Sequence, residues 1–125
     1  MSALNFLARH APTVESGAKC QTVRQRRKHP IVEGETLYLF TGMRTPACRR
    51  LRTTQCTLVR DINVTRGGTL KLDGTALSRA DAYAFARSDG MRDWDELRDF
   101  LAAQYGLPFR GVVIYWPCVD REVAA

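Results

Sequence analysis

Apolar runs along this chain are short, and most of them are typical of β-strands. Strands are predicted at residues 3–7, 20–26, 36–41, 52–62, 70–72 and 111–116. The last of these segments is continuously apolar, so we expect a central strand that is buried on both faces. The segment 20–26 is instead polar on both faces, which is unusual for a core strand and favours a functional site at this position.

Three segments have the apolar spacing or the end signals of helices: residues 11–16, 78–87 and 94–105. Gly17 is placed to end the first helix, Ser78 to begin the second and Asp93 to cap the third. Four side chains share one face of the third helix at helical spacing and are predicted to be core residues: Trp94, Leu97, Leu101 and Tyr105.

The predicted strands cluster in the middle of the chain, and the predicted helices lie near both ends. This order is typical of an α+β fold. With 125 residues, no internal repeat and no linker, residues 1–125 are expected to form a single domain with a hydrophobic core. Residues 120–125 are expected to be a frayed tail.

The chain carries a formal net charge of +6, and its basic residues concentrate at positions 24–28 and 44–52. Arginine fits phosphate oxygens well, so RNA or a nucleotide is a natural partner, while a merely solvated basic face explains the charge equally well. The longest apolar run is too short to cross a bilayer, and the N-terminus lacks the features of a signal peptide. We therefore expect a cytoplasmic protein with no membrane partner, and the sequence leaves its oligomeric state open.

The four cysteines are widely spaced and form no CxxC pair: Cys20, Cys48, Cys56 and Cys118. In a reducing compartment we expect reduced and mostly buried thiols rather than disulfides. The cysteines and the two histidines do not have the spacing of a zinc site. No metal and no other cofactor is therefore predicted.

Residues that carry chemistry gather in the segment Gly17-Ala18-Lys19-Cys20-Gln21-Thr22-Val23-Arg24. An amine, a hydroxyl and a guanidinium follow a helix-ending glycine, and such a cluster can bind an anion or activate a nucleophile. In a regular strand Thr22 and Arg24 share one face, while Lys19 points to the opposite face. Lys19 and Thr22 can therefore meet only if Lys19 lies on the turn after Gly17.

Several segments give the chain a resemblance to the ASCH domain, a member of the PUA-like superfamily. The matching pieces are Gly17-x-Lys19-x-x-Thr22-x-Arg24, Glu33-Gly34-Glu35-x-Leu37, Asp89-Gly90-Met91 and a closing strand that ends at Trp116. Their order and spacing cover nearly the whole chain. The resemblance implies one ASCH-like domain built as a small mixed PUA-like β-barrel with flanking helices and a cleft on one side.

The cleft of the ASCH family is generally thought to bind RNA or nucleotides, and this is the function that we rank first. By resemblance, Arg24 would bind or orient the ligand. Further basic residues would line the groove or its rim: Arg26, Arg27, Lys28 and Arg44. Because such binding depends on phosphate contacts, its affinity is expected to fall steeply with salt.

Some single-domain members of the family are amidohydrolases that deacetylate N4-acetylcytidine. By resemblance, Thr22 would be the nucleophile, Lys19 the base and Asp89 the acid or orienting group. The family has a glutamate at the position of Asp89, and aspartate is one methylene shorter. A hydrolase requires these three residues to converge, whereas a binding module requires only an open basic groove. A third interpretation is an interaction module with a vestigial pocket.

Overall fold

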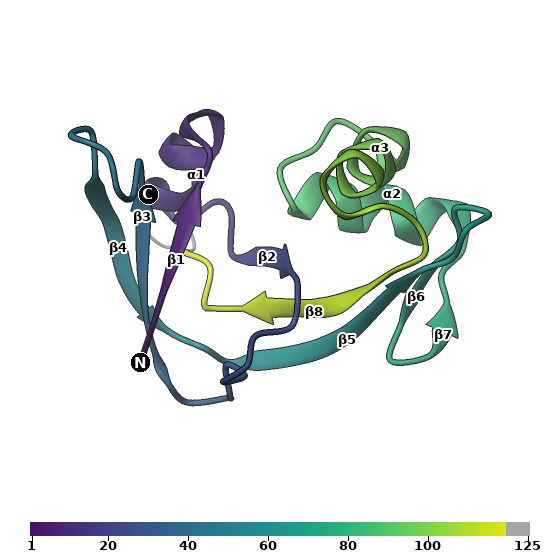
Figure 1. Ribbon diagram of the computed structural model, residues 1–125, viewed down its shortest axis with the longest axis horizontal. Coiled ribbons are helices and arrows are strands. Elements are labelled where there is room, and N and C mark those ends of the chain that lie inside the picture. The colour runs from purple at the N-terminus through teal and green to yellow at the C-terminus, as the bar shows by residue number, and fades with distance from the viewer. Residues whose placement is uncertain (120–125) are drawn as a thin grey trace.

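The chain folds into two β-sheets with helices on one side of them (Figure 1). The computed structural model describes residues 1–119, and the expected frayed tail at 120–125 lies outside them. The strands are β1 (Ser2–Phe6), β2 (Gln21–Arg24), β3 (Thr36–Thr41), β4 (Arg49–Gln55), β5 (Leu58–Val64), β6 (Leu70–Leu72), β7 (Thr75–Ala76) and β8 (Phe109–Tyr115). The helices are η1 (Ala8–His10), α1 (Ala11–Ser16), α2 (Arg79–Ser88) and α3 (Trp94–Tyr105).

One sheet has the strand order β1-β3-β4, and the other has the order β2-β8-β5-β6-β7. β1 and β3 run parallel, and the other neighbouring strands run antiparallel. The expected α+β class is therefore confirmed. Within residues 1–119 no strand pairing links the two sheets, so they do not close into the expected barrel.

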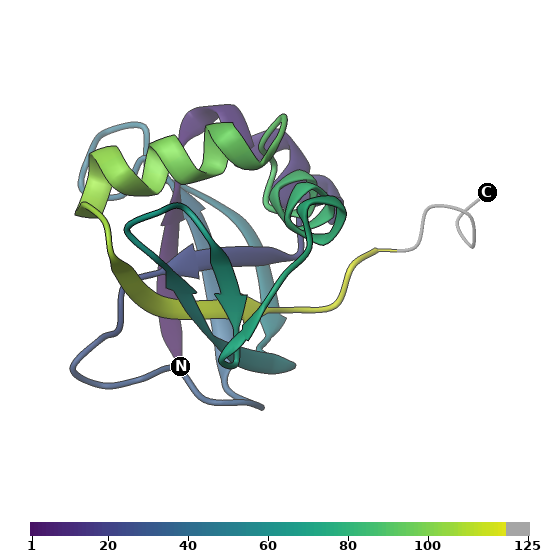
Figure 2. The same cartoon turned by 90° about the vertical axis from the view of Figure 1, so that its right-hand side faces the viewer.

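β8 lies between two hydrophobic cores because its two faces contact different elements. Val113 on one face packs in a core with residues of α2, α3, β5 and β6. Ile114 on the other face packs in a core with residues of β1, α1 and β3. Both side chains are almost fully buried, as expected for this continuously apolar segment. Figure 2 shows α2 and α3 lying over the sheet that contains β8.

The expected strand at residues 52–62 is wrong, because this stretch contains parts of two strands, β4 and β5. β4 pairs with β3 in the first sheet, and β5 pairs with β8 in the second. The chain changes sheets at Cys56 and Thr57, whose N–H groups donate to the carbonyl oxygens of Glu35 and Tyr115 at 2.9 Å. The polar and apolar pattern does not mark this change of partner.

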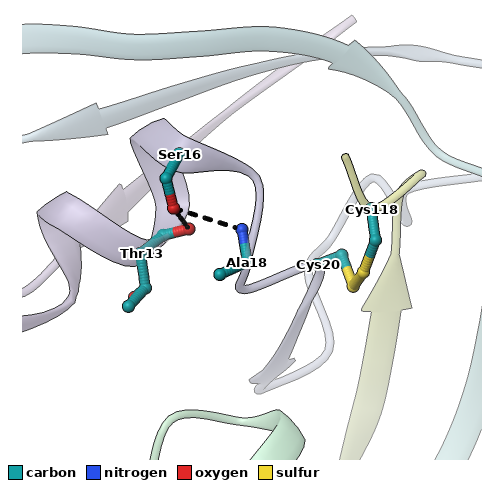
Figure 3. Close-up of a disulfide and its surroundings, with 5 residues drawn as sticks. All are labelled: Thr13, Ser16, Ala18, Cys20 and Cys118. Carbon is teal, nitrogen blue, oxygen red and sulfur yellow. Dashed lines mark hydrogen bonds between the residues drawn. A yellow bond between two sulfur atoms is a disulfide. The ribbon is translucent and has the colours of Figure 1, made fainter. Parts of the chain in front are cut away.

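The expectation of reduced cysteines is wrong for one pair, because Cys20 and Cys118 form a disulfide (Figure 3). Backbone hydrogen bonds bring these distant segments together: Trp116 N–H donates to the Cys20 carbonyl at 3.1 Å, and Val119 N–H donates to the Gly17 carbonyl at 3.2 Å. Spacing along the chain could not reveal this pairing, since the two cysteines are 98 positions apart.

The other two cysteines are free thiols in different surroundings. Cys56 is buried, as expected, whereas Cys48 is exposed, which corrects the expectation of a small core residue at that position.

Candidate functional site

A pocket opens between the β1–η1 segment, β2 and α3. Its cavity volume is about 170 Å³. A bound water needs only about 10–15 Å³ on such a measure, so the pocket has room for a small organic molecule. Polar residues line one part of it: Asn5, His10, Lys19, Thr22, Arg24, Asp89 and Gln104. Apolar and aromatic side chains complete the wall: Phe6, Leu7, Val23, Met91, Leu97, Phe100, Leu101 and Tyr105.

Lys19 reaches this pocket because it lies on the turn between α1 and β2. α1 ends at Gly17, which adopts the left-handed φ of 85° that favours glycine. The Lys19 N–H then donates to the Thr13 carbonyl at 2.9 Å, and β2 begins only at Gln21. Lys19 therefore lies outside the regular strand, which is the condition for its side chain to line the same pocket as Thr22.

Lys19 and Asp89 form a buried pair at the base of the pocket. The Lys19 Nζ lies 3.6 Å from Asp89 Oδ1 and also donates a hydrogen bond to the Asp89 backbone carbonyl. Lys19 is 4% exposed and Asp89 is 6% exposed, so neither charge is solvated by bulk water. Asp89 is held at this position because it follows α2, where its N–H caps the last turn by donating to Phe85 and Ala86.

Burial changes the acidity of both members of this pair. It lowers the pKa of the Lys19 ammonium, and Arg24 adds to this shift while Asp89 opposes it. Burial raises the pKa of the Asp89 carboxyl, and the nearby Lys19 opposes that shift. The lowered pKa leaves a larger fraction of Lys19 neutral, and so able to accept a proton, than in an exposed lysine, whose pKa is about 10.4.

Thr22 and Arg24 lie on the same face of β2, as their spacing predicted, and both line the pocket. The Arg24 Nε donates to Thr22 Oγ1 at 3.1 Å. The guanidinium is fixed by two further contacts: its Nη2 donates to the Asn5 carbonyl at 2.6 Å, and its Cζ lies 4.9 Å from the centre of the Phe6 ring. A cation is thus in direct contact with a buried hydroxyl.

The structure brings Lys19, Thr22 and Asp89 to one pocket, with Arg24 beside them. Within residues 1–119 the Thr22 hydroxyl is hydrogen-bonded to Arg24 and not to Lys19. A nucleophile and its base need to be within hydrogen-bond reach once a substrate is bound, and such contacts often tighten only in the complex.

The other expected ligand-binding cations do not line this pocket. Arg26 forms an ion pair with Asp61, and the Arg27 Nη2 donates to the Ala3 carbonyl at 2.8 Å. These two arginines line a neighbouring hollow, which shares Arg24 with the main pocket. Lys28 and Arg44 are exposed and line neither hollow. The expected basic groove is therefore scattered rather than continuous around the pocket.

Sequence reasoning missed several residues of the pocket wall. Phe100 and Gln104 are one helical turn apart on α3, and His10 lies where η1 meets α1. Tyr105, which was expected in the core, is 38% exposed and stacks on Phe109. An amphipathic helix next to a pocket divides its apolar face between core and ligand, and spacing alone does not show where that division falls.

Within residues 1–119, no group of three or more histidine, cysteine or acidic side chains is arranged to hold a metal ion. No helix in the same range has the length and the apolar character needed to cross a membrane. Comparison of the chain with family models, with curated proteins and with solved structures gives no match.

Proposed function

We propose that the protein is an ASCH-like amidohydrolase that removes an acyl group from a small modified nucleoside such as N4-acetylcytidine. The observation that carries this proposal is one pocket that contains the Lys19–Asp89 pair, the Thr22 hydroxyl and the Arg24 guanidinium. The pocket is the size of a small molecule, and of the basic residues expected to bind RNA only Arg24 lines it in the described part of the chain, while Arg26, Arg27, Lys28 and Arg44 lie outside it. Geometry therefore favours hydrolysis over the binding function that the charge alone suggested.

In the first half of the reaction, neutral Lys19 would accept the proton of the Thr22 hydroxyl while Oγ1 attacks the acyl carbonyl carbon. The C=O electron pair moves onto oxygen, and Arg24 would stabilise this negative charge because its guanidinium already contacts Oγ1. The C–N bond then breaks, and Lys19 returns its proton to the leaving nitrogen. Cytidine leaves, and an acetyl ester remains on Thr22.

In the second half, water attacks the ester carbonyl carbon, and Lys19 would accept a proton from that water. The C–O bond to Thr22 breaks, the threonine oxygen regains a proton from Lys19, and acetate leaves. Asp89 would keep the Lys19 amine positioned through the hydrogen bond to its backbone carbonyl and through its carboxylate at 3.6 Å. This is the role of the third group in a nucleophile–base arrangement.

A second candidate is an RNA- or nucleotide-binding domain of the ASCH type. It is favoured by the net charge of +6 and by the exposed Arg26 and Arg27, which line the neighbouring hollow that shares Arg24 with the main pocket. In that case Lys19 and Arg24 would bind the ligand and would catalyse no reaction.

The two candidates separate when purified protein is incubated with N4-acetylcytidine and the mixture is analysed by chromatography. The hydrolase proposal predicts cytidine and acetate in equal amounts. Absence of cytidine would overturn it. In that case, saturable binding of a short single-stranded RNA, weakening steeply with salt, would favour the second candidate.

A further inference from the structure

His10 lines the same pocket, yet the proposed reaction gives it no part. It is 9% exposed and lies beside Lys19, Thr22 and Arg24 in the pocket wall. Within residues 1–119, neither ring nitrogen of His10 has a hydrogen-bond partner. Neither ring nitrogen is fully shielded from solvent, so the unpartnered imidazole is open to the pocket that it lines and is available to hydrogen-bond a molecule bound there.

The imidazole lies against Gly90, the residue that follows Asp89. A Cβ atom added to Gly90 would lie 2.9 Å from His10 Nδ1 and 3.0 Å from Cε1, so the ring packs directly against the glycine backbone. Gly90 also has a left-handed φ of 93°, which disfavours a side chain at this position. The same loop therefore places Asp89 next to Lys19 and holds the ring of His10.

The surroundings keep His10 uncharged. Burial lowers its pKa from the usual 6.5 to about 4. This value already includes the lowering effects of the nearby Lys19, Arg9 and Arg24 charges and the opposing effect of Glu96, all of them smaller than that of burial. At neutral pH the ring therefore offers one N–H donor and one nitrogen acceptor. A base of such low pKa is poorly matched to proton abstraction near pH 7, so its chemistry is hydrogen bonding.

We propose that His10 is a further ligand-binding residue of this pocket, where its neutral imidazole forms a hydrogen bond with a polar group of the bound nucleoside or of its acyl group. The proposal deepens the hydrolase assignment and rests on the same pocket. A neutral imidazole can also polarise a carbonyl without adding a second full charge beside Lys19 and Arg24.

The direct test is an NMR titration of ¹⁵N-labelled wild-type protein that follows the imidazole resonances. Cytidine and N4-acetylcytidine are the probes, and exposed His29 is the internal reference. We expect the His10 ring signals to move saturably with either probe while the His29 signals stay in place. The free protein should also show a His10 pKa of about 4.

Variants give a second readout. His10→Phe keeps a flat ring without hydrogen-bonding atoms, and His10→Gln restores a donor and an acceptor. Loss of one net hydrogen bond predicts a fall of up to about tenfold in nucleoside affinity and in kcat/KM for His10→Phe. His10→Gln should recover part of the loss, and His29→Gln should match wild type.

The outcomes separate this inference from the hydrolase proposal. Saturable His10 shifts without turnover would overturn the hydrolase and support His10 as a binding residue. Turnover with unmoved His10 signals would support the hydrolase and overturn the role of His10. If neither turnover nor nucleoside binding is found, both are overturned. The wild-type titration tests whether His10 contacts the nucleoside even if His10→Phe does not fold.

Discussion

Lys19 and Asp89 are buried together, and each limits the free-energy cost of burying the other. The pair shares a pocket with Thr22, whose hydroxyl is contacted by Arg24. Strand periodicity put Thr22 and Arg24 on one face but left the position of Lys19 open, and the grouping of Lys19 and Thr22 with Asp89 was expected only from the resemblance to the ASCH domain. The sequence did not predict His10, since an isolated histidine before a helix carries no signal of a neighbouring pocket.

Lys19→Met is expected to lower the free energy of unfolding at pH 7 by about 3–5 kcal/mol, because it leaves a buried carboxylate without its partner. Removing Lys19 also removes the attraction that limits the rise of the Asp89 pKa. A carboxyl whose folded pKa is raised binds its proton more tightly in the folded state, so the deficit should shrink as pH falls from 7 to 5.

Urea unfolding of wild type and Lys19→Met at both pH values measures this effect. The double variant Lys19→Met/Asp89→Leu is the control, and it should recover most of the stability because no buried charge remains. A deficit of the same size in the double variant would contradict the buried-pair interpretation.

At the scale of elements, the end of α2 places Asp89 in the pocket. The sequence predicted this helix and its start, and the Ser78 hydroxyl does accept a hydrogen bond from the Asp81 N–H at 3.1 Å. It predicted α3 equally well, with Asp93 accepting from the Glu96 N–H at 2.9 Å. These helix caps involve residues three positions apart, so the sequence alone can reveal them. The split between β4 and β5 is not local, because it depends on which distant strand each one pairs with.

Gly90→Ala is expected to destabilise the protein and to weaken nucleoside binding. A left-handed alanine costs about 1–2 kcal/mol by itself, and the new Cβ would also press on the His10 ring. Crowding in a packed site typically costs a further 1–3 kcal/mol or so. Thermal unfolding and a cytidine titration measure the two effects.

Gly34→Ala is the matched control, since Gly34 has a φ of 91° and no atom within 4 Å of an added Cβ. It should lose only the backbone part of the stability and keep normal affinity for cytidine. Equal losses of stability and of cytidine affinity in the two variants would mean that the close packing of Gly90 against His10 contributes nothing to either.

At the scale of the whole molecule, two hydrophobic cores share β8, and the disulfide joins the end of this region to the turn that carries Lys19. The α+β class was predictable from the order of the elements along the chain, and the position of β8 between two other strands was predictable from its continuous apolar run. The division into two sheets and the Cys20–Cys118 pairing were not, since both depend on contacts between segments far apart in the chain.

The double variant Cys20→Ser/Cys118→Ser is expected to lose stability because the disulfide closes a loop between positions 98 residues apart. A loop of this length predicts a contribution of roughly 4–5 kcal/mol through the entropy of the unfolded chain. Guanidinium unfolding without reductant measures the loss, and wild type treated with reductant should behave like the variant. Cys48→Ser, which changes an exposed free thiol, is the control and should match wild type. Identical midpoints for the double variant and oxidised wild type would contradict this prediction.

The most direct test of the hydrolytic site is the rate of cytidine release from N4-acetylcytidine by wild type and by Thr22→Ala. Thr53→Ala is the matched control, because Thr53 is an exposed strand residue of β4 away from the pocket. The account predicts turnover by wild type and Thr53→Ala, and a loss of at least about a hundredfold in Thr22→Ala with its fold intact. Cytidine release by Thr22→Ala at the wild-type rate would contradict the assignment of Thr22 as the nucleophile.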